Sequence, residues 1–300
     1  MTETYRLGTI QDAIGVGTTL SKSWFRGHSR VIDGLVPRMF RAEFWDEPRL
    51  VLRPALELEI IETFRRHALL LSREALPSPD DHLGWLCLMQ HYGTPTRLLD
   101  WTENALTALC FAVASDQDED AELWAMRPWA LYRVANGRWG VPIPDRDARI
   151  QFLVRQSRWA GKSEELAMEV GLDEPVTCPI PLDPSRSSSR MAAQSSAFTI
   201  HPSPHESTLS IENALDNQKH LVRYIIPAGA KQKLRDQLDA LGVHDMALFP
   251  DLEGLSRYVV HESRIMAYGP PDPPHCGGAV EWNCSDRMIG TDSSPKRCGS

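Results

Sequence analysis

The sequence predicts an α+β fold in which a helical N-terminal half packs on a mixed or antiparallel sheet from the C-terminal half. Two observations support this class. Apolar residues recur at helical spacing in three segments between residues 54 and 115, and after Leu123 they fall in short segments separated by turn residues. The chain has 300 residues, of which 42% are hydrophobic, and this is enough material to bury a core.

The N-terminal half is predicted to be mainly helical, although residues 1–20 show little pattern. A first helix is predicted from about Pro54 to Glu74, because apolar residues repeat there at helical spacing and proline suits a first helical turn. A second helix is predicted to end at His91, because Gly93 follows it.

The segment TRLLDW at residues 96–101 is predicted to turn the chain into a third helix. That helix should run from Glu103 to about Ser115. Asp100 or Thr102 should cap it, because a side-chain oxygen there can accept hydrogen bonds from the unpaired amides of the first turn. The acidic run DQDEDAE that follows is predicted to be a solvated loop.

The second half is predicted to be rich in strands, with helices only at residues 230–241 and from about Leu252. The segments predicted as strands lie at residues 123–134, 175–182, 190–200, 207–211 and 219–228. For the whole chain we predict an N-terminal lead over 1–19, one domain over 20–262 and a loosely ordered tail over 263–300.

Composition argues against several classes of protein. The formal net charge of −8 disfavours bulk attraction to nucleic acid or to an anionic membrane. No stretch reaches the roughly 20 apolar residues that a membrane span needs, and the N-terminal MTETYRLGTI lacks the features of a signal peptide. We therefore predict a cytoplasmic protein without membrane association.

The six cysteines are too sparse for a disulfide scaffold, and Cys87 and Cys110 fall in apolar helical patterns typical of a core. Four metal-capable residues in the tail lack the close cysteine pairs of a zinc site; they are His275, Cys276, Cys284 and Cys298. The sequence therefore predicts no metal site, and it identifies no cofactor.

Four blocks stand out along the chain: FRG at 25–27, QHYGTPTRLLDWTENALTALCFAV at 90–113, AAQSSAFTIH at 192–201 and ALFPDLEGLSRYV at 247–259. In this order and spacing they resemble the FRG domain over residues 20–262, and the long second block is highly specific. Family members often have AQQG before the Phe-Thr pair, whereas this chain has Gln194, Ser195 and Ser196, so a turn glycine is replaced. The resemblance implies a bacterial or phage-related protein of undefined biochemical activity.

Arg26 is the first candidate for a ligand contact, because a guanidinium can hold a phosphate or carboxylate with two hydrogen bonds. The alternative is an ion pair with Asp100. Gly27 would let a ligand approach the backbone closely, or would simply form a turn, and His28 lies beside it. Arg97 and Asp100 are predicted to pair and to fix the turn, or, alternatively, to hold and orient an anion.

The remaining candidates also have two interpretations each. His91 would be a general acid or base, or a histidine that stabilises a helix end. Trp101 would stack on a base, or belong to the core, and Asn104 would contact a ligand or a neighbouring loop. Thr199 and His201 should share one face of a strand. Thr96 belongs to the same polar block as Arg97, and Glu253 would cap a helix or serve as an acid.

Three hypotheses follow for function. In the first, the protein binds a nucleotide-like or other anionic ligand, with ADP-ribosyltransferase-like chemistry as its most concrete form. The order Arg26, Thr199, Glu253 motivates that form, with roles at the pyrophosphate, the ribose and the ribose hydroxyl. In the second, the chain is a non-catalytic module that binds a ligand or an unidentified protein partner. In the third, the polar block is a structural network that joins helices.

The first hypothesis assigns Arg26, His91 and Glu253 to catalysis. The residues predicted to bind the ligand are Gly27, His28, Thr96, Arg97, Asp100, Trp101, Asn104, Thr199 and His201.

Overall fold

A computed structural model describes residues 2–32, 34–41, 55–71, 76–115, 117–137, 139–159, 161–183, 188–204, 207, 210–215 and 219–268. The predicted helix ends at Pro54 and Glu74 and the metal-capable residues of the tail lie outside these ranges. The chain divides into two compact units, residues 1–258 and 259–300, and the sheet and the candidate site both belong to the first.

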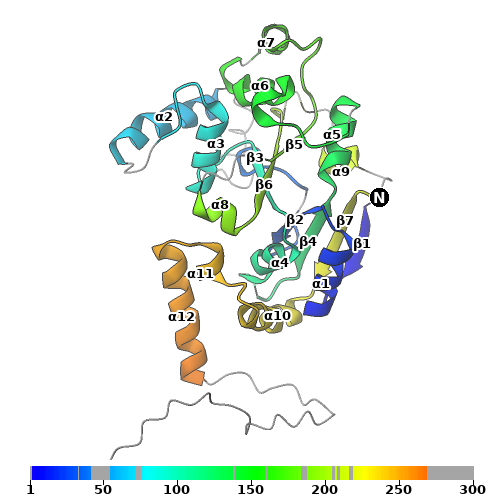
Figure 1. Ribbon diagram of the computed structural model, residues 1–300, viewed down its shortest axis with the longest axis vertical. Helices are drawn as coiled ribbons and strands as arrows, with labels where there is room; N and C mark the ends of the chain where they lie inside the picture. The colour runs from blue at the N-terminus through cyan, green and yellow to red at the C-terminus, as the bar shows by residue number, and fades with distance from the viewer. Residues whose placement is uncertain are drawn as a thin grey trace, which may run out of the picture. The chain divides into compact units, whose positions relative to one another are not determined.

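The strands of the first unit form one seven-stranded sheet in the order β1-β7-β4-β2-β3-β6-β5 (Figure 1). Strand β1 runs parallel to β7, and the other neighbouring pairs are antiparallel, so the sheet is mixed. The strands are β1 Glu3–Arg6, β2 Trp24–His28, β3 Leu98–Thr102, β4 Ala121–Met126, β5 Ile180–Leu182, β6 Ser196–Ile200 and β7 Leu221–Ile226. The predicted α+β class is confirmed, but the sheet takes strands from both halves of the chain.

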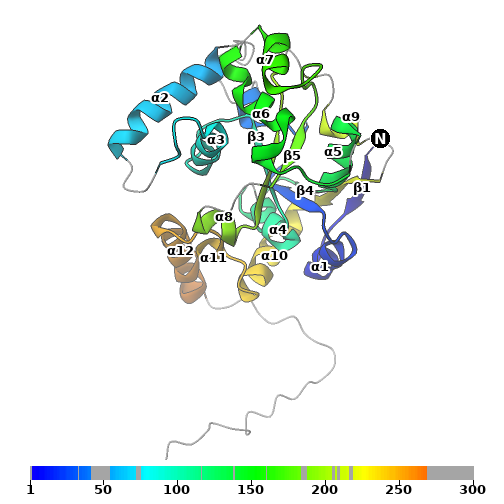
Figure 2. The same ribbon diagram turned by 45° about the horizontal axis from the view of Figure 1, so that its top comes forward.

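Helices cover both faces of this sheet (Figures 1 and 2). The longer helices are α1 Ile10–Thr19, α2 Leu56–Leu71, α3 His82–His91, α4 Ala105–Val113, α5 Pro128–Asn136, α6 Ala148–Arg155, α7 Ser163–Val170, α10 Ala228–Ala240 and α12 Leu252–Tyr268. The short ones are η1 Arg38–Phe40, η4 Pro144–Arg146, η5 Gln156–Trp159, α8 Ser189–Ala193, α9 Ile211–Ala214 and α11 Asp245–Leu248. The helices predicted up to His91, at 103–115 and at 230–241 are confirmed within two residues, and residues 56–71 of the helix predicted at 54–74 are helical.

The first twenty residues form β1 and α1, which the sequence did not predict. Helix α1 begins with a capping box in which the Thr9 side chain accepts from the Asp12 amide and the Asp12 carboxylate accepts from the Thr9 amide. Strand β1 pairs with β7, so the N-terminal residues are part of the sheet.

Several other local predictions were wrong. Most of the expected turn at 96–101 belongs to strand β3, which begins at Leu98, and the cap of α4 is Asn104, whose side chain accepts from the amides of Leu106 and Thr107. The acidic run is exposed at residues 117–120, as predicted for a solvated loop, but it ends in the buried strand β4, where Glu122 is paired inside the sheet. The segment 123–134 changes from strand to helix α5, for which Pro128 supplies the first turn.

The second half also contains more helix than the sequence predicted. Helices α6 and α7 occupy segments for which no helix was expected. The segment 190–200 begins in α8 before it enters β6, and Ile211 begins α9. Helix α12 starts at Leu252 as predicted but continues to Tyr268, beyond the predicted start of the tail.

Three apolar cores hold the first unit together. Helices α1, α4 and α10 pack on one face of β2 and β4, where Phe25 and Leu123 are buried. Helices α5 and α9 pack on the opposite face, where Trp24 and Trp124 are buried. Adjacent residues of one strand thus belong to different cores, because successive side chains point to opposite faces. A third core joins β5 and β6 to α2, α3, α6 and α7.

Gly27 lies against the backbone of α4. A Cβ atom at this position would lie 1.9 Å from the carbonyl oxygen of Ala108 and 2.8 Å from the amide nitrogen of Ala112. Close packing of strand on helix therefore explains this glycine. We expect Gly27→Ala to destabilise the protein by about 1–3 kcal/mol through overpacking, measured by urea unfolding. Gly15→Ala is the matched control, since nothing lies within 4 Å of its Cβ position. Equal midpoints for the two variants would contradict this account.

Candidate functional site

The sheet opens between its neighbouring strands β2 and β3. These strands pair at a single position, Phe25 opposite Thr102, whereas β2 pairs with β4 at five positions and β3 with β6 at five. A cavity of about 370 Å³ lies beside the divergence. Its polar lining residues are Arg26, Arg38, Arg41, Gln90, His91, Thr94, Asp100, Thr102, Arg190, Gln194 and Ser196. The cavity thus combines both walls of the opening with side chains from α3, η1 and α8.

Arg26 bridges the opening. Its Nη1 donates to the backbone carbonyl oxygen of Asp100 at 2.7 Å, in place of a strand-to-strand backbone hydrogen bond. The same nitrogen lies 3.8 Å from the Asp100 carboxylate, so the predicted Arg26–Asp100 ion pair exists but is long. The Arg26 side chain is 15% exposed. Burial lowers the pKa of Arg26 to about 10, and the nearby guanidiniums of Arg41 and Arg38 contribute to this shift.

Buried polar groups orient the Arg26 guanidinium. Its Nε donates to Nε2 of His28 at 2.6 Å, and His28 Nδ1 lies 2.8 Å from the Glu122 carboxylate, which also binds Arg223. Because Nε2 accepts, Nδ1 is the nitrogen that carries the proton and donates to Glu122. Burial, with Arg26 nearby, lowers the pKa of His28 to about 4, so this ring is neutral at pH 7. His28 therefore orients Arg26 and does not itself line the cavity.

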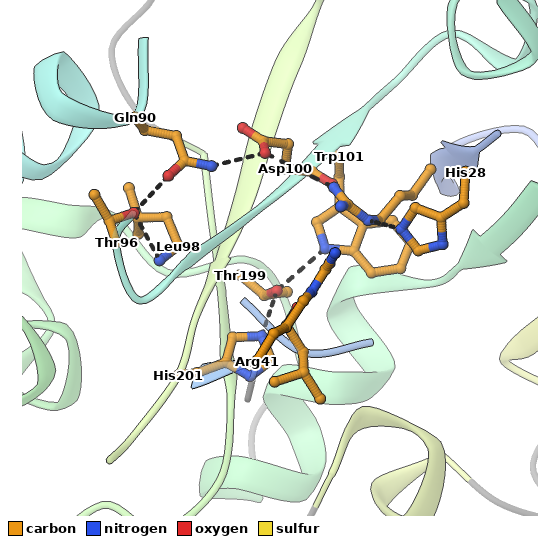
Figure 3. A network of polar contacts seen from close by, with 11 residues as sticks. His28, Arg41, Gln90, Thr96, Leu98, Asp100, Trp101, Thr199 and His201 are labelled. Atoms are coloured by element: carbon orange, nitrogen blue, oxygen red, sulfur yellow. Dashed lines mark hydrogen bonds and ion pairs between the residues drawn. The ribbon is translucent and has the colours of Figure 1, made fainter. Parts of the chain in front are cut away.

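A second chain of hydrogen bonds orients the Asp100 carboxylate (Figure 3). Gln90 Nε2 donates to Asp100 Oδ2 at 2.7 Å, and Gln90 Oε1 accepts from the Thr96 hydroxyl at 2.6 Å. The Thr96 oxygen in turn accepts from the amide of Leu98. Thr96 is fully buried and does not line the cavity, so it acts on the site only through its hydrogen bond to Gln90.

Trp101 belongs to a third group of polar contacts. Its indole Nε1 donates to the Thr199 hydroxyl at 3.1 Å, and Thr199 lies 3.0 Å from Nε2 of His201. The prediction that Thr199 and His201 share one face of a strand is therefore confirmed for their side chains. Burial lowers the pKa of His201 to about 3, which leaves a neutral ring that can accept from Thr199. Trp101 lines the cavity, whereas Thr199 and His201 are buried behind it.

The cavity is also lined by three arginines that the sequence patterns did not identify: Arg38, Arg41 and Arg190. Arg38 Nη1 donates to the Gly93 carbonyl, and Arg41 Nε donates to the Val36 carbonyl. Arg38 and Arg41 are three residues apart at one short 3₁₀ turn, a spacing that places side chains on the same side. That spacing is a signal in the sequence that could have identified them.

Arg190 approaches the cavity from α8. It donates to the His91 carbonyl at 3.2 Å, and its guanidinium lies 4.5 Å from the centre of the Phe249 ring. Burial lowers the pKa of Arg190, and Asp100 is among the charges that raise it. Ser195, at the end of α8, has φ of 46°, a left-handed conformation that favours glycine.

Arg97 has a structural role, and its predicted pairing with Asp100 was wrong. Its guanidinium forms a buried ion pair with Glu57 of α2 and donates to Gln156 Oε1 and to the His201 carbonyl. The Arg97 side chain is 2% exposed and does not line the cavity. Side chains alternate between the two faces of an extended chain, so residues three positions apart point to opposite faces. The Arg97 side chain therefore points away from Asp100.

The structure places the other predicted residues in different surroundings. His91 lines the cavity, and Asn104 is occupied as the α4 cap. Glu253 does not line the cavity; it is exposed in the first turn of α12, where it pairs with Arg257 at 2.7 Å. Of the three residues assigned to catalysis, Arg26 and His91 therefore meet at the cavity and Glu253 does not.

Residues 21–121 match the family model of the FRG domain. The chain contains an FRG domain. The match spans β2, β3 and α4, and therefore includes both walls of the opening in the sheet. Arg190 and Phe249, which complete the cavity beside the FRG domain, come from later in the chain. No curated protein and no solved structure matches the chain.

Among the described residues, no helix combines the length and apolar character that crossing a membrane requires. These residues also contain no cluster of three or more His, Cys, Asp or Glu side chains suited to a metal ion. In the FRG domain, Cys87 and Cys110 are free thiols, and burial raises the pKa of each to about 12, so neither is a reactive nucleophile near neutral pH.

Proposed function

We propose that the cavity between β2 and β3 binds a small anionic ligand through a phosphate or carboxylate group. The observation that supports this is the charge of the lining, to which Arg26, Arg38, Arg41 and Arg190 contribute. Asp100 is the one acidic residue among the described residues that line the cavity. This concentration of positive charge occurs in a chain whose formal net charge is −8.

The guanidiniums act on each other electrostatically, and a bound anion would be attracted to all of them. Arg38 and Arg41 both act on Arg26 in this way, since their charges lower its pKa. Guanidinium groups also match phosphate and carboxylate oxygens geometrically. The cavity volume of about 370 Å³ falls in the range of small-molecule sites.

Phosphate binding tests this function directly. We expect the protein to bind inorganic phosphate and pyrophosphate in calorimetric titrations, and Arg41→Gln and Arg38→Gln each to weaken binding about tenfold or more, as loss of a hydrogen bond to a charged group implies. Arg66→Gln is the matched control, because Arg66 is exposed on α2 and does not line the cavity. Absence of binding to the unaltered protein, or equal losses in all three variants, would refute the proposal.

The ADP-ribosyltransferase-like alternative has less support. It assigns the acid to Glu253 and the ribose contact to Thr199, but Glu253 is paired with Arg257 outside the cavity, and the Thr199 hydroxyl is occupied by Trp101. That alternative predicts release of nicotinamide from NAD, and the binding function does not require it. The cytoplasmic location remains a prediction from the sequence.

A further inference from the structure

Asp100 is an unexpected side chain for a pure anion site, because its carboxylate repels any anion that the arginines attract. Its side chain is 55% exposed, so it is not a buried partner of Arg26. Arg26 makes its short hydrogen bond to the backbone oxygen of Asp100 and keeps 3.8 Å from the carboxylate. The long ion pair with Arg26 therefore leaves the carboxylate accessible to another group.

The hydrogen-bond chain behind Asp100 fixes which oxygen is available. The amide of Leu98 donates to the Thr96 oxygen, so the Thr96 hydroxyl must donate onward, to Gln90 Oε1. The Gln90 amide nitrogen is then directed at Asp100 Oδ2. Oδ1 accepts no hydrogen bond within the part of the chain that the structure describes. Asp100 lines the cavity, so its Oδ1 is left as an acceptor for a group outside the described protein.

An ionised carboxylate accepts hydrogen bonds and cannot donate them, so the matching group on a ligand must be a donor. The arginines Arg26, Arg38 and Arg41 disfavour a cationic donor such as an ammonium group by charge repulsion. A hydroxyl group meets both requirements. The same molecule would then carry an anionic group for the arginines and a hydroxyl for Asp100.

The aromatic side chains of the cavity do not offer a platform for a nucleobase. Arg190 and Arg257 lie over the Phe249 ring, 4.5 Å and 4.4 Å from its centre, and Phe111 contacts it edge to face. The Trp101 side chain is buried, and its indole nitrogen is bonded to Thr199. Stacking on the Phe249 ring would require displacement of the guanidiniums already in contact with it, and the buried Trp101 ring exposes little surface to a base.

We infer that the cavity takes a phosphate monoester of a hydroxylated carbon chain, of the sugar phosphate class, with the phosphate at Arg26, Arg38 and Arg41 and a hydroxyl on Asp100. This inference rests on the proposed anion-binding function and specifies its ligand. The relevant atoms lie close to each other, since Arg26 is bonded to the backbone of Asp100 and shares the cavity with Arg38 and Arg41.

The variant Asp100→Asn distinguishes two effects of Asp100 on ligand binding, namely a hydrogen bond to a ligand hydroxyl and repulsion of the ligand's negative charge. Methyl phosphate and ribose 5-phosphate are titrated into the full-length protein by calorimetry. We expect ribose 5-phosphate to bind about tenfold more tightly than methyl phosphate, and Asp100→Asn to reduce this ratio about fivefold or more, while methyl phosphate itself binds more tightly because the repulsion is removed. Glu165→Gln makes the same charge change on the exposed part of α7 and should leave the ratio unchanged.

The results distinguish failure of the inference from failure of the proposed function. If methyl phosphate binds but ribose 5-phosphate binds no better, the anion site stands and the hydroxyl inference is overturned. The hydroxyl inference also fails if Asp100→Asn strengthens the binding of both ligands equally, because Asp100 then only balances charge. Adenosine 5′-monophosphate distinguishes free sugar phosphates from nucleotides. Affinity within about threefold of ribose 5-phosphate supports recognition of the sugar phosphate alone, and a gain of tenfold or more would overturn the assignment by showing base recognition.

Discussion

Replacing Arg97 with alanine is expected to lower the free energy of unfolding by about 3–5 kcal/mol, because the change leaves the Glu57 carboxylate buried without its partner. The guanidinium also satisfies Gln156 and the carbonyl oxygen of His201. One side chain therefore connects α2, η5 and the end of β6. Urea unfolding followed by circular dichroism measures the loss.

Two controls make the Arg97 prediction specific. The double variant Glu57→Leu/Arg97→Met should be more stable than Arg97→Met alone, because it removes the buried charge together with its partner. Asp100→Ala should stay within about 1 kcal/mol of the unaltered protein, because the Asp100 side chain is half exposed. Similar large losses for Arg97→Ala and Asp100→Ala would instead support a single structural network across the whole polar block.

The protein is expected to lose stability steeply as the pH falls from 6.5 toward 4. Burial lowers the pKa of His28 to about 4 and that of His201 to about 3, from the ordinary value of 6.5, and the charge of Arg26 lowers both further. Both rings are neutral in the folded protein, so the unfolded chain binds more protons below pH 6.5. Their contribution is complete above that pH and is lost as the pH approaches the folded values.

The size of the acid effect follows from linkage. Each histidine contributes a slope of about 1.4 kcal/mol per pH unit between its unfolded and folded pKa, so two of them remove roughly 5–7 kcal/mol between pH 7 and pH 4. Urea unfolding at pH 7, 6, 5 and 4 gives the profile. His201→Gln should reduce the slope by about one proton. A flat profile would show that these rings are not held neutral by burial.

Local patterns in the sequence were sufficient to predict the fold class and most of the long helices. Apolar residues recur every three or four positions in α2 and α10, and β7 is rich in branched apolar residues. Strand β3 was mistaken for a turn because polar and apolar residues are mixed in LLDWT. Its burial pattern follows from long-range pairing with β6, which no local pattern encodes.

The candidate site was predictable only in part for the same reason. Arg26, Asp100 and Trp101 stand in strands that diverge, so the sequence identified them by residue type and position. Arg97 pairs with Glu57, 40 residues earlier in the chain, and Arg190 reaches the cavity from 90 residues beyond Asp100. Sequence spacing contains no information on such contacts until the sheet order is known.

The position of the Phe-Arg-Gly segment in β2 also determines how the strand can be aligned with its neighbours. Phe25 and Gly27 face α4, whereas Arg26 faces the opposite layer with Trp24 and His28. A shift of one residue would drive the Arg26 side chain into a helix backbone that excludes even a methyl group. The tripeptide therefore fixes the register of β2 in the middle of the sheet. A single-residue insertion within β2 should destabilise the protein far more than an insertion in the exposed turn that precedes the strand.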